Sequence, residues 1–245
     1  MRVRDWIGTG RAVGSLRRAL HGTDRATATT QPEHATQPCE MCVQPIPQQH
    51  SHVVDVESRE LLCTCRPCSF LFVSQGAAGG RYQAVPERYL RFDGVALAQA
   101  QWDALQIPVG MAFLFHNSQL DRTVAFYPSP AGATESELPI EAWTEILEHN
   151  PALGQATPNV EAILVASPTA QGLVPAEDES DPRFECYLVP IDTCYELVGH
   201  LRTSWRGFDG GQEVRARVAQ FFTDLRGRAR PEPRHSRHAT AREVT

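Results

Sequence analysis

Short apolar stretches in the second half of the chain mark out β-strands. Hydrophobic residues at alternate positions, or in runs of roughly four to eight bounded by turn residues, are typical of strands. This pattern predicts strands at 111–115, 123–127, 160–165 and 184–189. The first two are joined through the polar stretch Asn117-Ser118-Gln119, which suits the turn of a β-hairpin.

Helical periodicity, with apolar residues three or four positions apart, separates these strands. It predicts helices at 95–105, 138–149 and 191–202, and a final helix that follows Gly210-Gly211 and ends at about Leu225. Asp192 is placed to cap the third of these helices. Residues 128–136 and 167–182 are rich in turn-forming or acidic residues, and we expect them to be loops. Because strands and helices intermix without strict βαβ repetition, the sequence predicts an α+β domain with a mainly antiparallel sheet.

Composition divides the 245 residues into four segments. A content of 42% hydrophobic residues is enough for a core, but the two ends of the chain lack apolar side chains to bury. We therefore expect a mostly disordered tail at 1–37, a cysteine-rich module at 38–75, an α+β domain at 76–225 and a disordered Arg-rich tail at 226–245.

The cysteine-rich module contains two CxxC pairs, Cys39/Cys42 and Cys65/Cys68, separated by 22 residues. Two such pairs can place four thiolates about 2.3 Å from one Zn(II) ion. The segment between them reads as a β-hairpin, so the order is that of zinc ribbons and treble-clef modules. A module of this size has too little apolar area to fold alone, whereas structural zinc supplies roughly 10–16 kcal/mol of apparent binding energy in small fingers. The pattern therefore predicts a structural zinc centre whose four coordination positions are all filled by protein ligands.

A fifth thiol, Cys63, leaves the ligand set open. If residues 61–65 are extended, Cys63 points to the same side as Cys65 and could replace it, act beside the ligands, or be a buried apolar side chain. His52 is a further alternate ligand, and His50 lies close to it in sequence.

Iron is the main alternative to zinc. Rubredoxins also use two CxxC pairs, but a glycine normally follows each pair, whereas Val43 and Ser69 stand at those positions here. An iron-thiolate centre would make the chain an electron-transfer protein, and an iron–sulfur cluster is a more remote option.

The distribution of charge bears on a third reading, a nucleic-acid-binding zinc ribbon. Residues 38–225 carry 11 Arg against 24 acidic residues, a net charge of -13, which would repel a phosphate backbone. The excess of Arg lies in the two tails. We therefore expect no nucleic-acid partner for the body of the chain.

Hydropathy predicts the compartment. The N-terminus lacks the continuous apolar run of a signal peptide, and no stretch approaches the roughly 20 apolar residues of a membrane span. We therefore expect a cytoplasmic protein with no membrane contact, whose thiols are kept reduced.

No catalytic signature stands out in the sequence. Cys186 and Cys194 fall on a predicted strand and helix, and the scattered histidines form no recognisable motif with them. We accordingly expect a non-enzymatic protein. Trp205, Arg206 and Phe208 combine two aromatic rings with a guanidinium group near glycines, and are candidates for binding a protein partner.

Six stretches together resemble a bacterial family of unknown molecular function whose genes lie beside nickel-iron hydrogenase genes. They are CEMC with CTCRPC, GGRYQAVPERYL, AFYPSPAGATES, LVPIDTCYELVGHLR and WRGFDGG, and they cover most of residues 39–225. The resemblance implies accessory or maturation work for hydrogenase, with a hydrogenase subunit or a maturation factor as partner. It carries over no catalytic residue.

Overall fold

The computed structural model describes residues 37–129, 131–137, 140–168, 183–206 and 211–233. The chain divides into two units, Met1–Ala84 and Val85–Thr245. The expectations for 1–36, for 234–245 and for most of the acidic loop at 167–182 lie outside the described residues. Among the residues that the structure describes, no helix is both long and apolar enough to cross a membrane.

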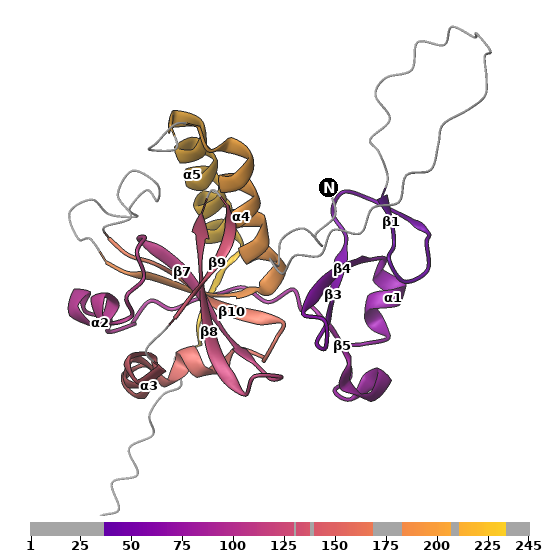
Figure 1. Cartoon of the computed structure of the whole chain (residues 1–245), viewed down its shortest axis with the longest axis horizontal. Coiled ribbons are helices and arrows are strands. Elements are labelled where there is room, and N and C mark those ends of the chain that lie inside the picture. Colours follow the sequence, from indigo (N-terminus) through magenta and orange to yellow (C-terminus); the bar gives the residue numbers. More distant parts are fainter. Residues whose placement is uncertain (1–36, 130, 138–139, 169–182, 207–210, 234–245) are drawn as a thin grey trace, which may run out of the picture. The chain divides into compact units, whose positions relative to one another are not determined.

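The first unit is a small module built on two sheets (Figure 1). Strands β1 (Gln37–Pro38) and β2 (Pro45–Ile46) pair antiparallel around the first CxxC pair. Strands β3 (Ser51–Asp55), β4 (Glu60–Thr64) and β5 (Tyr82–Ala84) form a second antiparallel sheet in the order β4-β3-β5. Helix α1 (Arg66–Phe70) follows β4, and the turn η2 (Ala77–Gly80) precedes β5. The expected module ended at residue 75, and the observed sheet also takes in β5.

A seven-stranded sheet forms the centre of the second unit. Its order is β12-β6-β11-β10-β7-β8-β9, and every pair is antiparallel except β12 with β6. The strands are β6 (Leu90–Arg91), β7 (Met111–Asn117), β8 (Arg122–Ser129), β9 (Gly132–Ser136), β10 (Glu161–Ala166), β11 (Glu185–Pro190) and β12 (Arg230–Pro231). Every residue of β10 is buried, as expected for a central strand covered on both faces.

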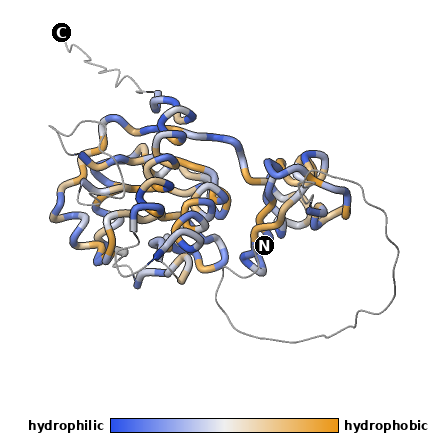
Figure 2. The backbone as a smooth tube through the Cα atoms, turned by 90° about the horizontal axis from the view of Figure 1, so that it is seen from above, coloured by the Kyte–Doolittle hydropathy of each residue, from blue (hydrophilic) through white to orange (hydrophobic). Residues whose placement is uncertain are grey.

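Helices cover both faces of this sheet (Figure 1). They are α2 (Gln99–Ala104), α3 (Ile140–His149), α4 (Ile191–Ser204) and α5 (Gly211–Arg228), with a short turn η3 (Pro151–Gln155) after α3. Trp102 of α2 and Trp143 of α3 pack in one core cluster with Leu114 and Ile163 of the sheet. On the other face, the ring of Tyr195 in α4 lies edge-on to Phe113, 6.1 Å between centroids. Figure 2 shows hydrophobic and hydrophilic stretches interspersed along the backbone of the described residues.

The predicted fold class, α+β with a mainly antiparallel sheet beside a four-cysteine module, is confirmed. The four strands and the four helices form close to their predicted positions, and Asn117 begins the turn of the β7–β8 hairpin. The first helix is shorter than predicted, because it begins only at Gln99. The cap prediction is wrong: Pro190 is the N-cap of α4, and Asp192 lies in the first turn of the helix.

Two segments expected to be irregular are ordered. The predicted loop at 128–136 contains β9, an edge strand that pairs with β8 and buries little apolar surface. The first residues of the tail expected from residue 226 are ordered, since α5 runs to Arg228 and β12 follows it. Arg226 of this segment is held by Glu185, with Nε 3.1 Å from one carboxylate oxygen and Nη2 2.5 Å from the other.

Candidate metal centre

Two different backbone structures present the four cysteines. Cys39 and Cys42 lie in the tight turn between β1 and β2, in which the N–H of Val43 donates to the carbonyl of Cys39 at 2.9 Å. Cys65 is the N-cap of α1, and Cys68 lies in the first turn of that helix, with the N–H of Ser69 donating to the carbonyl of Cys65 at 3.0 Å. The order of elements is therefore a turn, a β-hairpin and a helix, which is the arrangement of a treble-clef module.

The four sulfur atoms converge on one point. All lie within 4.8 Å of one another, and the Sγ atoms of Cys42 and Cys65 are 3.7 Å apart. A tetrahedral Zn(II) ion with bonds of about 2.3 Å requires sulfur atoms about 3.8 Å apart. The four side chains therefore fit one tetrahedral ion. Cys39 is buried and Cys42 is exposed, so the centre lies at the surface of the module.

The electrostatics of the thiols favour a cation at this point. Burial disfavours the charged form of Cys39, but N–H groups of Cys65, Cys42 and Met41 donate to its sulfur and lower its pKa to about 6. The pKa of Cys68 is raised to about 12, first by sharing a proton with Cys65 and then by burial. Four ionised thiols this close together repel one another, and a bound divalent ion removes that repulsion.

The structure does not place the alternates Cys63 and His52 with these four sulfurs. Cys63 lies in β4 opposite His52 of β3, and their ligand atoms group with that of His50. Of the candidate ligands named from the sequence, Cys39, Cys42, Cys65 and Cys68 form one group, and Cys63 and His52 belong to another.

Glu40 was not identified from the sequence, although it stands between the first two cysteines. Its carboxylate accepts the N–H of Cys63 at 2.8 Å, and its own N–H donates to the carbonyl of Cys63 at 2.9 Å. Two hydrogen bonds thus join the first CxxC turn to β4, which leads directly into Cys65. A glutamate in a CxxC pair gives no signal of such a role, because its partner lies 23 residues away.

Residues 38–229 match the family of unknown function DUF5947. The chain belongs to this family. No curated protein and no solved structure matches the chain. The match begins one residue before Cys39 and ends one residue after α5, so it includes the four cysteines and parts of both units of the DUF5947 chain.

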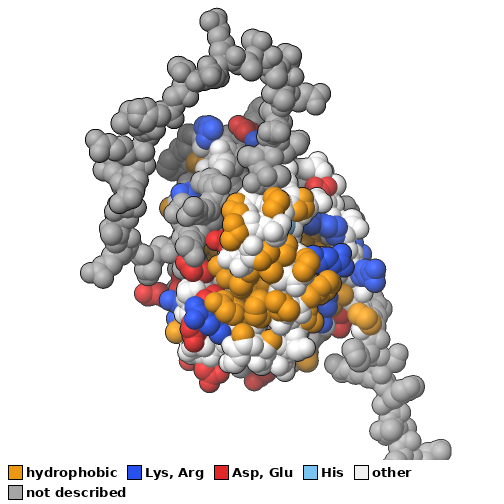
Figure 3. Space-filling view, turned by 90° about the vertical axis from the view of Figure 1, so that its right-hand side faces the viewer, with side chains coloured by type: hydrophobic (Ala, Val, Ile, Leu, Met, Phe, Trp, Pro, Cys, Tyr) orange, Lys and Arg blue, Asp and Glu red, His pale blue; other side chains and the backbone are white. Residues whose placement is uncertain are grey.

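Large apolar side chains are exposed next to the metal-binding turns of this DUF5947 member. Phe70, Leu71 and Val73, at the end of α1 and just after it, are 61%, 67% and 64% exposed. Arg66 lies over the ring of Phe70, 5.3 Å from its centroid. Figure 3 shows hydrophobic side chains gathered on the face it presents, with basic side chains along one edge. Soluble proteins rarely expose several large apolar side chains together unless the surface binds a partner.

The partner-binding candidates at the end of α4 are only partly described. Trp205 is half-buried, Arg206 is exposed, and Phe208 lies outside the described residues. The guanidinium group of Arg206 donates to the carbonyls of Thr203 and Trp205, at 3.3 and 3.0 Å. Arg206 therefore caps the end of α4.

The two remaining cysteines behave as core residues. Cys186 of β11 and Cys194 of α4 are buried and unpaired. Burial raises the pKa of Cys186 to about 12 and that of Cys194 well above its ordinary value. Thiols that resist ionisation are poor nucleophiles, which suits packing rather than catalysis.

Proposed function

We propose that this DUF5947 chain is a non-enzymatic accessory protein that binds zinc and acts through protein contacts in the assembly or maturation of nickel-iron hydrogenase. The observation that carries the proposal is a complete set of four sulfur ligands beside exposed apolar side chains on the same module. Four thiolates leave no coordination position for a substrate, so the ion has a structural role. The exposed apolar surface is then the part of the module that would bind the protein partner.

Zinc is favoured over iron by the residues around the thiols. Ser69 stands where the second rubredoxin-type turn normally has glycine, and here it is buried within helix α1. A module of this size also needs the folding free energy that a tightly bound structural ion supplies. We propose a single structural Zn(II) held by Cys39, Cys42, Cys65 and Cys68.

The proposed partner is a hydrogenase subunit or a maturation factor, as the family resemblance implies. Phe70 and Leu71 would insert into an apolar surface of that partner, and Arg66 would face an acidic group at its edge. The complex would form in the cytoplasm, where reducing conditions keep the seven free cysteines as thiols.

Gene deletion in a host that makes the hydrogenase tests this role. We expect the deletion to lower the amount of mature hydrogenase without changing its transcript. Wild-type complementation should restore maturation, whereas the F70D/L71D variant should not, because two carboxylates would have to be buried at the interface. As a matched control, L120D changes another exposed leucine, on the second unit, and should complement fully. Normal hydrogenase activity in the deletion strain would refute the proposal.

A further inference from the structure

A second group of metal-binding side chains lies on the β3–β4 hairpin. His52 and Cys63 are direct partners in the antiparallel register, so their side chains share one face of the sheet. His50 lies two residues before His52, on that same face, and the two imidazole rings are 4.7 Å apart. One ligand atom from each of His50, His52 and Cys63 lies within 4.8 Å of the other two.

The hydrogen bonds of His50 fix its tautomer in the form that binds metal. Its Nδ1 lies 3.0 Å from the carbonyl oxygen of Pro47, which only accepts, so Nδ1 carries the proton. Its Nε2 lies 3.2 Å from the amide nitrogen of Gln37, which only donates, so Nε2 presents a lone pair. Metal-binding histidines almost always donate their other N–H to a backbone carbonyl or carboxylate. His50 already has this arrangement, with Gln37 in the place that an ion would take.

We propose that His50, His52 and Cys63 form a second site that binds one exchangeable transition-metal ion of the zinc type. Two imidazoles and a thiolate suit borderline ions such as Zn(II), rather than the hard ions that prefer oxygen ligands. An ion about 2.0–2.3 Å from each ligand atom needs those atoms about 3.3–3.6 Å apart. The three ligand atoms lie within 4.8 Å of one another, so modest rotations of the side chains would bring them to these separations.

The coordination differs from that of the four-cysteine centre. Three protein ligands leave the fourth position of a tetrahedral ion open to water, as in catalytic zinc sites. Both histidines are half-exposed, whereas Cys63 is 8% exposed and packs with Cys39 and Ile46. The ion would therefore enter from the histidine side and sit next to the four-cysteine centre. Its open position makes it the ion that exchanges, while the four thiolates retain theirs.

Metal stoichiometry of the untagged full chain tests the second site, with zinc as the probe. The chain is reduced, saturated with Zn(II), freed of unbound metal by gel filtration and analysed for elements. We expect about two zinc ions per chain for the wild type and about one for H50A/H52A, since removing two of three ligands abolishes the site. A matched control, H149A/H200A, removes two histidines of the second unit and should keep both ions.

Cobalt distinguishes the two centres and checks folding. Co(II) bound by four thiolates and Co(II) bound by two imidazoles and a thiolate have different visible spectra. The H50A/H52A variant should keep the four-thiolate spectrum, which shows that the module is folded, and lose the second set of bands. One ion per chain in the wild type would overturn the proposal. So would a second ion that persists in H50A/H52A, which would identify it as adventitious.

Discussion

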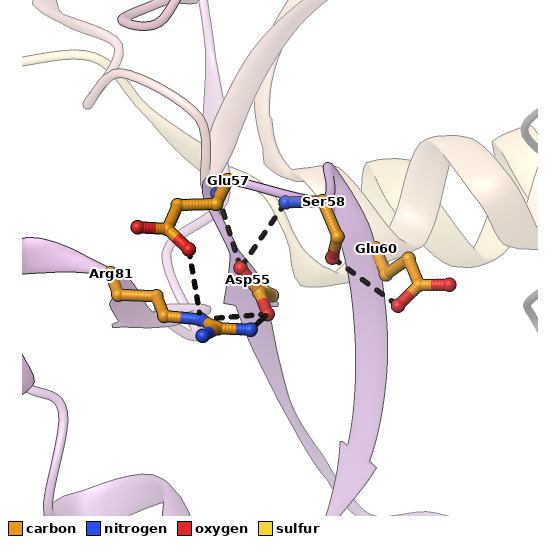
Figure 4. Close-up of polar contacts among 5 residues, drawn as sticks. All are labelled: Asp55, Glu57, Ser58, Glu60 and Arg81. Atoms are coloured by element: carbon orange, nitrogen blue, oxygen red, sulfur yellow. Dashed lines mark hydrogen bonds and ion pairs between the residues drawn. The ribbon is translucent and has the colours of Figure 1, made fainter.

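Asp55 accepts two hydrogen bonds from the guanidinium group of Arg81, 2.8 and 3.1 Å from its Oδ2 (Figure 4). Its other oxygen, Oδ1, accepts the N–H groups of Glu57 and Ser58, at 3.1 and 3.3 Å, in the turn between β3 and β4. One buried carboxylate thus joins the β3–β4 hairpin to the residue that leads into β5. The segment GGRY, which the sequence marks only as part of a stretch that carries the family resemblance, contributes this arginine.

Replacing Asp55 with Asn should destabilise the module by about 2–3 kcal/mol at neutral pH, because hydrogen bonds to charged groups are lost in a buried position. The hydrogen bonds from Arg81 and from the turn outweigh burial, and they lower the pKa of Asp55 below 3.8. A lowered pKa gives stability that is complete above the unfolded-state value and is lost as pH falls through the folded-state value. The difference between wild type and D55N should therefore be constant down to about pH 5 and shrink below about pH 4.

Hydrogen exchange of the β3 and β4 amides, corrected for intrinsic rates, measures this difference. Loss of metal in acid affects the wild type and D55N alike, so the difference between their stabilities reports the contribution of Asp55. Glu57 provides the control, since it contacts the same arginine at 3.4 Å but is 63% exposed. The E57Q variant should lose no more than about 1 kcal/mol. Equal losses in D55N and E57Q would contradict a special role for the buried carboxylate.

Removing the proposed structural ion should unfold the first unit and leave the second intact. Chelation should abolish protection of the β3 and β4 amides, while β7 and β10 keep theirs, because each unit has a core of its own. The chain with its tightly bound ion should be colourless and contain zinc. Visible absorption with stoichiometric iron, in protein from iron-replete cells, would favour the electron-transfer alternative instead.

Serine substitutions distinguish the roles of Cys63 and Cys65 in metal binding. We expect C63S to retain the tightly bound ion, because Cys63 groups with His50 and His52, and C65S to lose it. Elemental analysis after treatment with a chelating resin gives the result, and the four-thiolate Co(II) spectrum of C63S confirms the ligand set. The reverse outcome would assign the second ligand pair to Cys63 and Cys68.

The local sequence pattern was enough to predict the elements that pack against the core and to group the four cysteines as metal ligands. Periodicity located β7, β8, β10 and β11 because each buries a continuous or alternating apolar face. Periodicity did not predict the edge strands β9 and β12, because an edge strand pairs with one neighbour only and can be polar. The sequence pattern assigned Arg226 to a basic tail, because its ion-pair partner, Glu185, lies 41 residues away.

The surroundings of the cysteines depend on register, which local pattern does not determine. The β3–β4 pairing places Cys63 opposite His52, and a shift of one residue would have moved Cys63 to the other face. The sequence therefore left three roles open for Cys63. The same applies to Glu40, whose two hydrogen bonds to Cys63 exist only in this register.

Val43 follows Cys42 with a φ of 65°, a left-handed conformation that is rare for a β-branched residue. The turn thus has the backbone shape for which other two-CxxC proteins use glycine. We expect V43G to stabilise the zinc-bound module by about 1 kcal/mol, since relief of the strained φ exceeds the entropy cost of glycine. The Val43 residue is 74% exposed, so little packing is lost. In competition with a chromophoric chelator, this corresponds to about five-fold tighter zinc binding. The V43A variant keeps a Cβ atom and should gain less, whereas equal affinity in V43A and V43G would show that the strain at this position is negligible.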